Sequence, residues 1–395
     1  MTILFLHNRY RWRGGEDEMF DDYVKTSIQI GHHTVLYTQG GWSEPLRKIV
    51  ELVLFPFTAL FSLRTYRDIY RIVQKEHPDF AVVFNPFPFL SISALLALRN
   101  NNIPIVLYIP NYRLFPAFRS NDLFSFRIGN IKKHLRDLGI FRVRDALYAF
   151  IAYCYRIVDL RHIITEILVP SKYMKDRIVS LKGFPHQRIA IIEHCSAPEA
   201  FRFTRNRRKR NTNRLSLVYV GRLSPEKGVN VLIHAVNGLN QVTLTIIGDG
   251  PQRRNLMQLA HDLHVKHVRF VGQLWGNQKW KLMQKSDICV VPSVWPEPFG
   301  LSVVEAMAMG MCVVASRSGA IPDLISDHVN GILFEAGNAK DLASKLKWLT
   351  FHDDVVGIMG SNARITAKKR FVKTIFREEL NRLFRRMLRS RGFTI

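Results

Sequence analysis

Short apolar runs alternate with longer amphipathic segments along the chain. In the first half, the runs 2–6, 78–85 and 104–109 are short and largely apolar, as expected of strands buried on both faces of a sheet. Segments with helical periodicity, such as 16–30 and 90–100, lie between these runs. Because strands and helices alternate, the sequence predicts an α/β protein with parallel sheets.

The same alternation starts again in the second half. Further strands are expected at residues 215–220, 242–247, 268–272, 287–291 and 311–315. Residues 301–309 fit a short helix that Gly310 ends, so we expect a helix between the last two of these strands. A second sheet of the same kind therefore follows the first.

A basic run separates the two halves. Residues 205–210 contain five Lys or Arg and nothing apolar, a composition typical of a solvated hinge or arm, although a nucleic-acid patch has similar letters. Near the C-terminus, apolar residues at helical spacing are surrounded by Arg and Lys, so this helix either packs on the first domain or touches a membrane. We expect a Rossmann-like domain at 1–197, a basic linker at 198–214, a second Rossmann-like domain at 215–370 and a C-terminal amphipathic helix at 371–395.

Length and composition fit this division. At 395 residues and 47% hydrophobic, the chain can bury a core in each of two domains. The N-terminal residues do not resemble a signal peptide, and no run reaches the roughly 18 apolar residues of a spanning helix. The cysteines are too far apart to suggest a zinc site or a disulfide framework: Cys154, Cys195, Cys289 and Cys312. We therefore expect a cytoplasmic protein.

The charge balance predicts anionic partners. Lys and Arg outnumber Asp and Glu by 57 to 32, a net charge of +25. Nucleic acid, an anionic membrane face and phosphorylated substrates all qualify, but no motif of a nucleic-acid-binding fold is present. Segments 46–63 and 131–162 mix apolar and basic residues, so each is either a membrane-surface element or a helix packed on its own domain.

The segment 292–310 carries the strongest candidate chemistry. Phe299 and Gly300 precede the predicted helix, whose free N–H groups favour an anion, and Gly300 has no Cβ to keep a phosphate away. Glu305 lies one turn into the helix, where a carboxylate can accept hydrogen bonds from a diol such as ribose. Glu297 lies on the preceding loop. Spacing alone does not distinguish these two glutamates from ordinary surface charges.

Other stretches could contact the same ligand. Gly14 and Gly15 precede the first helix, where a glycine pair either brings N–H groups to a phosphate or makes a turn. Arg222 and Lys227 follow a strand, and two cations there suit a diphosphate or form a surface pair. The Gly-Asp-Gly turn at 248–250 also lies at the end of a predicted strand, where α/β proteins bind ligands.

Together these stretches resemble a known signature. Glu-Pro-Phe-Gly-Leu at 297–301 and Glu-Ala-Met-Ala-Met-Gly at 305–310 are similar to the motif of the retaining nucleotide-sugar glycosyltransferases of family 4, also described as glycosyl transferases group 1. The resemblance covers nearly the whole chain and is strongest at 218–330. It implies the GT-B fold, in which two Rossmann-like α/β/α domains face a cleft. The first domain would lie on the acceptor side, and the second would bind the nucleotide-sugar.

The resemblance also implies roles for residues. Glu297 would contact the donor sugar, and Arg222 with Lys227 would stabilise the leaving diphosphate. Asn111 and Arg113 match the family on the acceptor side. Neither a metal nor another cofactor is expected. The residues expected to bind the donor are Gly14, Gly15, Glu16, Gly248, Gly250, Phe299, Gly300, Leu301 and Glu305.

The implied function is sugar transfer with retention of anomeric configuration. The acceptor would be a glycan or a lipid-linked molecule in cell-surface polysaccharide or lipopolysaccharide synthesis, and the enzyme would lie on the cytoplasmic face of an anionic membrane. Two stretches depart from the family pattern: Pro110 replaces a histidine, and Glu193-His-Cys-Ser replaces Pro-Asn-Gly. A non-catalytic GT-B subunit that binds nucleotide or a partner transferase is therefore the alternative. Charge alone suggests a third class, a nucleic-acid-binding protein.

Overall fold

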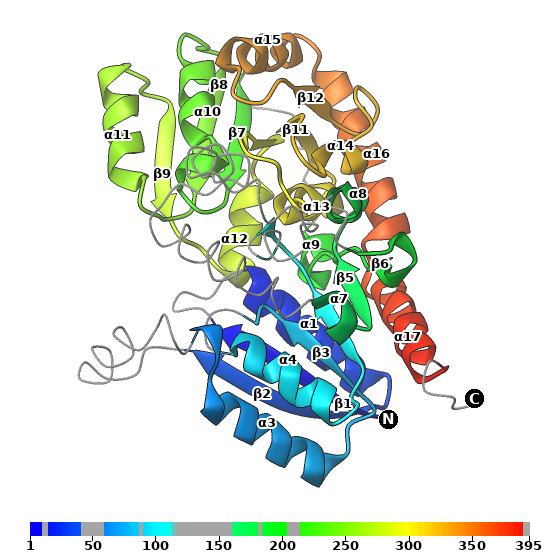
Figure 1. The fold of residues 1–395 in the computed structure, drawn as a ribbon. Coiled ribbons are helices and arrows are strands. Elements are labelled where there is room, and N and C mark those ends of the chain that lie inside the picture. The colour runs from blue at the N-terminus through cyan, green and yellow to red at the C-terminus, as the bar shows by residue number, and fades with distance from the viewer. Residues whose placement is uncertain are drawn as a thin grey trace. The chain divides into compact units, whose positions relative to one another are not determined.

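Two parallel sheets organise the computed structural model of the chain (Figure 1), which describes residues 1–9, 15–40, 59–86, 90–112, 114, 160–180, 184–203 and 214–389. Each sheet contains six described strands. Met1–Ile192 and Arg377–Ile395 form the first unit, and Glu193–Phe376 form the second. The predicted α/β fold is therefore confirmed.

The first unit alternates strands and helices in the order expected. Its described elements are β1 (Thr2–Arg9), α1 (Gly15–Gln29), β2 (His33–Gly40), α3 (Leu63–Glu76), β3 (Phe80–Phe84), α4 (Ser91–Asn100), β4 (Ile105–Tyr108), α7 (Leu160–Ile163), β5 (Glu166–Val169), α8 (Lys172–Ser180), η3 (His186–Arg188) and β6 (Ile189–Ile191).

The second unit repeats the pattern. Its elements are α9 (Pro198–Arg202), β7 (Leu215–Val220), η4 (Pro225–Lys227), α10 (Val229–Val236), β8 (Val242–Ile247), α11 (Arg253–Asp262), β9 (Val268–Gly272), α12 (Gly276–Met283), β10 (Ile288–Val291), α13 (Leu301–Ala308), β11 (Cys312–Ser316), α14 (Ile321–Leu324), β12 (Ile332–Phe334), α15 (Ala339–Thr350) and α16 (Asp353–Arg370).

Strand order creates a reversal point in each sheet. The first sheet runs β2-β1-β3-β4-β5-β6, and the second runs β12-β11-β10-β7-β8-β9. The chain thus moves outward in one direction from β1 or β7 and later returns to that strand's other side. In open α/β sheets ligands bind beyond the carboxyl ends of the strands at such a reversal, here between β1 and β3 and between β7 and β10.

Hydrophobic cores cover both faces of the second sheet. Leu217, Val290 and Val314 belong to one buried cluster together with residues of α10 and α15. Their chain neighbours Val218 and Val291 belong to the other, with residues of α12, α13 and α16. Because successive strand residues point to opposite faces, burial on both faces explains the continuous apolar runs in the sequence.

The last helix, α17 (Lys373–Arg389), begins in the second unit, and its residues from Arg377 onward belong to the first. Within the first unit the ring of Phe384 lies 5.4 Å from that of Phe80 and 5.6 Å from that of His32. Arg386 donates hydrogen bonds to both carboxylate oxygens of Glu166 on β5, where the Nε–Oε2 distance is 3.2 Å. Aromatic packing and this ion pair hold α17 against the first sheet.

Several of the predicted segments lie partly or wholly outside the described residues. The first residues of the expected linker, 198–202, form α9, whose Ala200 is buried in the second unit's core. The basic run 205–210, residues 46–58 and residues 131–159 lie outside the described residues. Leu63, at the end of the expected segment 46–63, instead begins α3.

Candidate active site

A lysine and a glutamate meet at the reversal point of the second sheet. Lys227 lies in the turn η4 after β7, and Glu297 lies on the loop between β10 and α13. Lys227 Nζ donates to Glu297 Oε1 at 2.6 Å, although the two residues are 70 positions apart in sequence. The adjacent strands β7 and β10 therefore bring together two of the residues expected to be catalytic.

Glu297 is tightly held at this point. Ser293 Oγ donates a hydrogen bond to the same oxygen, Oε1, that accepts from Lys227. The Glu297 side chain is only 9% exposed, against 30% for that of Lys227. Among the described residues nothing is hydrogen-bonded to Oε2. The carboxylate thus has one oxygen fixed by the protein and a second available to a ligand.

A glycine lets the neighbouring loop brace the backbone of Glu297. The loop after β11 donates the N–H of Ala320 to the carbonyl oxygen of Glu297 at 2.8 Å. Gly319 has a φ of +61°, and a Cβ there would lie 2.2 Å from that oxygen and 2.3 Å from the Glu297 nitrogen. Only glycine allows this approach without moving one of the two loops.

The start of α13 has the geometry expected of an anion site. Gly300 precedes the helix with a φ of +102°, and Leu301 is its first residue. The first N–H groups of a helix have no partner within it and carry its positive dipole end. Phe299 is 4% exposed and packs edge-on against His194, with ring centroids 4.9 Å apart. Phe299 therefore anchors the loop in the core rather than facing a ligand.

His194 belongs to one of the stretches that depart from the family pattern. Burial lowers the pKa of its imidazole to about 3. The side chain is neutral near pH 7, and its residue is only 4% exposed. It is thus a packing group and cannot replace the histidine missing at Pro110 as an accessible proton carrier.

Glu305, which the sequence predicts to bind a ribose, has a partner that the sequence did not indicate. Lys279 on α12 donates from Nζ to Glu305 Oε1 at 2.9 Å. The side chains are 16% and 11% exposed, so the pair is largely buried. Glu305 also contributes to raising the pKa of Cys289 on β10 to about 12, after the larger effect of burial. That shift keeps the Cys289 thiol protonated and unreactive.

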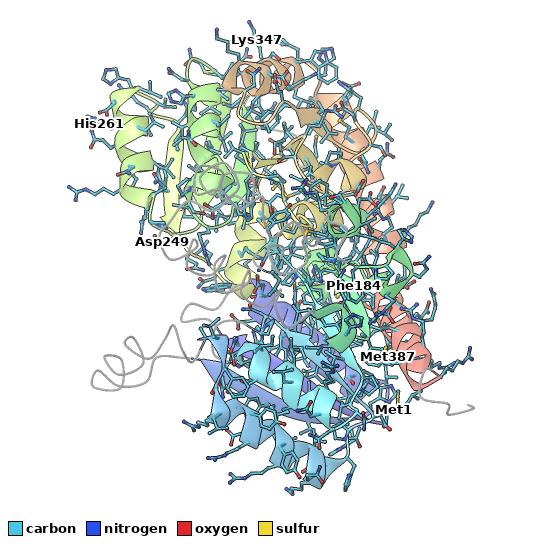
Figure 2. The ribbon with its side chains drawn as sticks, in the orientation of Figure 1. Met1, Phe184, Asp249, His261, Lys347 and Met387 are labelled. Atoms are coloured by element: carbon cyan, nitrogen blue, oxygen red, sulfur yellow. The ribbon has the colours of Figure 1, made fainter. Side chains whose placement is uncertain are left out.

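The turn after β8 packs against the turn after β7. A Cβ at Gly248 would lie 1.8 Å from the carbonyl oxygen of Gly221, and one at Gly250 would lie 2.5 Å from that of Leu223. These glycines therefore have a packing role in the described structure. Gly250 also lines an open hollow of about 540 Å³ along α11, together with His261, which is labelled in Figure 2.

The other expected cation, Arg222, lies at the same edge of the sheet. Tyr219 Oη donates to the Arg222 carbonyl oxygen at 2.8 Å, which fixes the backbone there. The residue is exposed, and none of the described residues forms an ion pair with its guanidinium. Its side chain is therefore available to an anionic ligand.

In the first unit, the expected donor and acceptor residues also meet. Asn111, after β4, donates from Nδ2 to Glu16 Oε1 at 2.5 Å. Gly15 begins α1 and is exposed, and a Cβ there would meet no atom within 4 Å. Gly14 and Arg113 lie outside the described residues. Beneath this edge, His7 and Asp17 form a buried pair at 2.9 Å.

A metal site is not evident in the described part of the chain, where no group of three or more His, Cys, Asp or Glu is placed to bind an ion. The charge stabilisation available at the second unit's edge comes from Lys227, Arg222 and the helix α13.

Comparison with known proteins identifies the second unit. Residues 201–366 match the family described as glycosyl transferases group 1. The match covers most of the second unit and less than half of the chain. An uncharacterized glycosyltransferase of Methanocaldococcus jannaschii is 31% identical over 191 residues, which are 45% of this chain and 49% of that protein. The phosphatidyl-myo-inositol mannosyltransferase of Mycobacterium leprae is 36% identical over 143 residues, 35% of this chain and 38% of that protein.

These matches leave part of each relative uncovered: the chain spans about half or less of the length of the two glycosyltransferases. A solved structure covers more. The Anabaena protein HepE, crystallised with UDP and glucose, aligns with a TM-score of 0.67 over 97% of this chain and 99% of its own, at 19% identity. That likeness shows the fold, which is GT-B.

Proposed function

We propose that the chain is a glycosyltransferase that moves a sugar from a nucleotide-sugar to an acceptor hydroxyl, with retention of anomeric configuration. The observation that carries the proposal is the Lys227–Glu297 pair at 2.6 Å, beside the start of α13 at the reversal point of the sheet. HepE, a protein of the same fold, was solved with UDP and glucose, which supports a nucleotide-sugar as donor.

The chemistry needs cations more than a strong base. When the bond between C1 and the diphosphate oxygen breaks, its electron pair stays on the diphosphate, where negative charge grows. Lys227, Arg222 and the first N–H groups of α13 would stabilise this charge. The acceptor oxygen forms its bond to C1 from the same face, and its proton passes to the diphosphate oxygen. Glu297 Oε2 would hold the donor sugar.

Replacing Lys227 with alanine tests this assignment. We expect turnover to fall by a factor of about 10² to 10³, the usual cost of losing one donor aimed at developing charge. Lys347→Ala on α15 is the matched control, because Lys347, which is labelled in Figure 2, is exposed. Release of nucleoside diphosphate from its sugar derivatives is the measurement, and unchanged turnover in Lys227→Ala would refute the assigned role.

A non-catalytic nucleotide-binding subunit is the second candidate, which Pro110 favours. In the absence of an accessible imidazole at that position, a bound nucleotide-sugar could remain intact. This alternative predicts that the wild-type protein is stabilised by a nucleoside diphosphate and yet releases none from any sugar derivative, with or without an acceptor. Measurable release would exclude it.

We further propose a lipid-linked acceptor and a peripheral position on an anionic membrane. The described helices include none long and apolar enough to cross a bilayer. However, one exposed side of α3 carries four cations together with Leu63, 53% exposed, and Tyr70, 46% exposed. The cations are Arg64, Arg67, Arg71 and Lys75. A basic face with apolar and aromatic side chains is typical of helices that lie on anionic lipid.

Vesicle sedimentation tests this position. Vesicles containing phosphatidylglycerol should bind the protein, vesicles of phosphatidylcholine alone should not, and 0.5 M salt should release it, since each surface cation contributes about 1 kcal/mol. The variant Arg67→Glu/Arg71→Glu should lose most of the binding, and the control Lys345→Glu/Lys347→Glu on α15 should keep it. Equal loss in both variants would indicate that net charge, rather than α3, determines binding.

A further inference from the structure

Lys279 and Glu305 form a buried ion pair that the proposed chemistry does not use. Lys279 comes from α12 and Glu305 from α13, with 2.9 Å between Nζ and Oε1. At 16% and 11% exposure, these side chains are less accessible than most surface ion pairs, which contribute little to stability. Placing two charges in such surroundings is costly unless each is well satisfied. The pair therefore differs from an ordinary exposed ion pair.

The ammonium of Lys279 is fixed from a second side. Its Nζ lies 3.8 Å from the centroid of the Trp280 ring, a distance at which a cation is attracted to an aromatic face. Trp280 is only 3% exposed and belongs to the same hydrophobic cluster as Phe299 and Val303, on the loop and helix that carry Glu305. The lysine head is thus held by a ring that cannot move without disturbing the core around α13.

Glu305 keeps one oxygen free for a ligand. Oε1 accepts from Lys279, and no side chain or backbone group in the described ranges is hydrogen-bonded to Oε2. The residue is the fifth of α13, so at 1.5 Å per residue it lies about one turn, roughly 5 to 6 Å, from the start of the helix. A nucleotide whose phosphate binds at that start would place its ribose about this far along the helix.

We propose that Lys279 is a positioning residue: by holding Oε1 of Glu305 it aims Oε2 at the ribose diol, and so makes the site select ribonucleotides over 2′-deoxyribonucleotides. This inference rests on the proposed function, because it requires a nucleotide at α13. A freely rotating carboxylate could adapt to either sugar, whereas a fixed oxygen loses its hydrogen bond when the 2′-hydroxyl is absent.

The test compares each nucleoside diphosphate with its 2′-deoxy analogue. UDP, GDP and ADP are screened first by calorimetry, and the one that binds is measured against its deoxy form. Wild-type protein should prefer the ribonucleotide by about 10- to 100-fold, the range of one hydrogen bond to a charged group. Lys279→Met should reduce that preference to threefold or less, and Lys279→Arg should restore most of it, since a guanidinium can also donate to Oε1.

Two further variants keep the test decisive if Lys279→Met folds poorly. Lys279→Met/Glu305→Gln removes both charges, so no carboxylate remains unpaired, and it should also lack the preference. The second variant is Glu305→Gln alone. If Lys279 acts through Glu305, the single and the double variant should have the same ratio of ribonucleotide to 2′-deoxyribonucleotide affinity. Lys281→Met, an exposed lysine on the same helix, is the control and should bind as wild type does.

The outcomes separate this inference from the proposed function. If Lys279→Met weakens both nucleotides equally, the lysine contacts phosphate or supports the fold, and the inference is wrong while nucleotide binding stands. If the variant retains the wild-type preference, the inference is also wrong. If the wild-type protein binds none of the nucleotides, the proposed function fails and this inference fails with it.

Discussion

At the residue scale, the approach of Gly319 to Glu297 offers a sharp test of the site. Gly319→Ala would place a Cβ 2.2 Å from the Glu297 carbonyl oxygen in a left-handed backbone conformation. We expect the free energy of unfolding to fall by about 2 to 4 kcal/mol, combining backbone strain with overpacking. Turnover should fall about 100-fold if Glu297 moves by an ångström. Denaturant unfolding and a transfer assay measure the two effects.

Gly337→Ala is the matched control for this prediction. Gly337 also has a positive φ, +82°, but a Cβ there meets no atom within 4 Å. It should cost only the backbone strain, about 1 kcal/mol, and leave turnover unchanged. Equal effects of the two substitutions would show that the contact with Glu297 is unimportant.

The buried His194 predicts a pH dependence. Its pKa of about 3 in the folded protein lies below the ordinary 6.5, so between these values the unfolded chain binds one more proton. Stability is therefore lost as pH falls from 6.5 toward 3, by about 1.4 kcal/mol per pH unit, or about 2 kcal/mol at pH 5. In denaturant titrations at pH 4.5 to 7, the free energy of unfolding of His194→Gln should depend less steeply on pH, by the contribution of one proton. Parallel slopes would contradict the prediction.

These residue contacts also mark the limit of sequence reasoning. Glu297 and Lys227 could be predicted because each lies in a recognisable motif after a strand. Lys279 could not: it is 26 positions from Glu305, and nothing in the local pattern of α12 distinguishes it from Lys281, which is exposed. Only the packing of α12 beside α13 decides which lysine reaches the carboxylate.

At the scale of elements, α17 is held to the first sheet by Arg386 and Glu166. Burial raises the pKa of Glu166, and Arg386 opposes that shift. Arg386 is 58% exposed, so breaking this pair should cost less than breaking a fully buried one. We expect Arg386→Met to lower the free energy of unfolding by about 1 to 3 kcal/mol near pH 7.

The loss should depend on pH in a defined direction. An acid whose folded pKa is raised stabilises the fold below its unfolded pKa, near 4.5, and loses that contribution as pH rises through the folded pKa. The penalty of Arg386→Met should therefore be larger at pH 8 than at pH 4.5, as chemical denaturation at the two values can show. Arg382→Met is the control, because the side chain of its partner Glu379 is 37% exposed, against 9% for that of Glu166. A penalty independent of pH would mean that packing, not charge, explains it.

Most elements were predictable because burial on both faces leaves a continuous apolar run, as in β10 and β11, and because Gly310 ends α13. The order of strands was not. That β7 pairs with both β8 and β10 depends on how far the chain travels before it returns, which no local pattern encodes. The reversal point, and with it the meeting of Lys227 and Glu297, follows from that order.

At the scale of the whole molecule, the two units should respond differently to nucleotide. The residues proposed to bind diphosphate and ribose lie in the second unit. A nucleoside diphosphate at 100 times its dissociation constant should stabilise the protein by about 2.7 kcal/mol. Hydrogen exchange should slow most at 222–228 and 292–305, and little in α3. Protection centred on α3 instead would contradict the proposed donor site.

The helix α17 also bears on how the protein is made. A ribosome releases the first sheet long before it releases Phe384 and Arg386, which belong to the same unit. Until then Phe80 lacks the ring of Phe384, and Glu166 lacks the guanidinium of Arg386. The second unit is made of contiguous residues, so it does not need a later segment of the chain. The first unit thus begins to emerge before the second but is completed after it, and a nascent chain stalled before residue 377 lacks the part of α17 that packs on the first sheet.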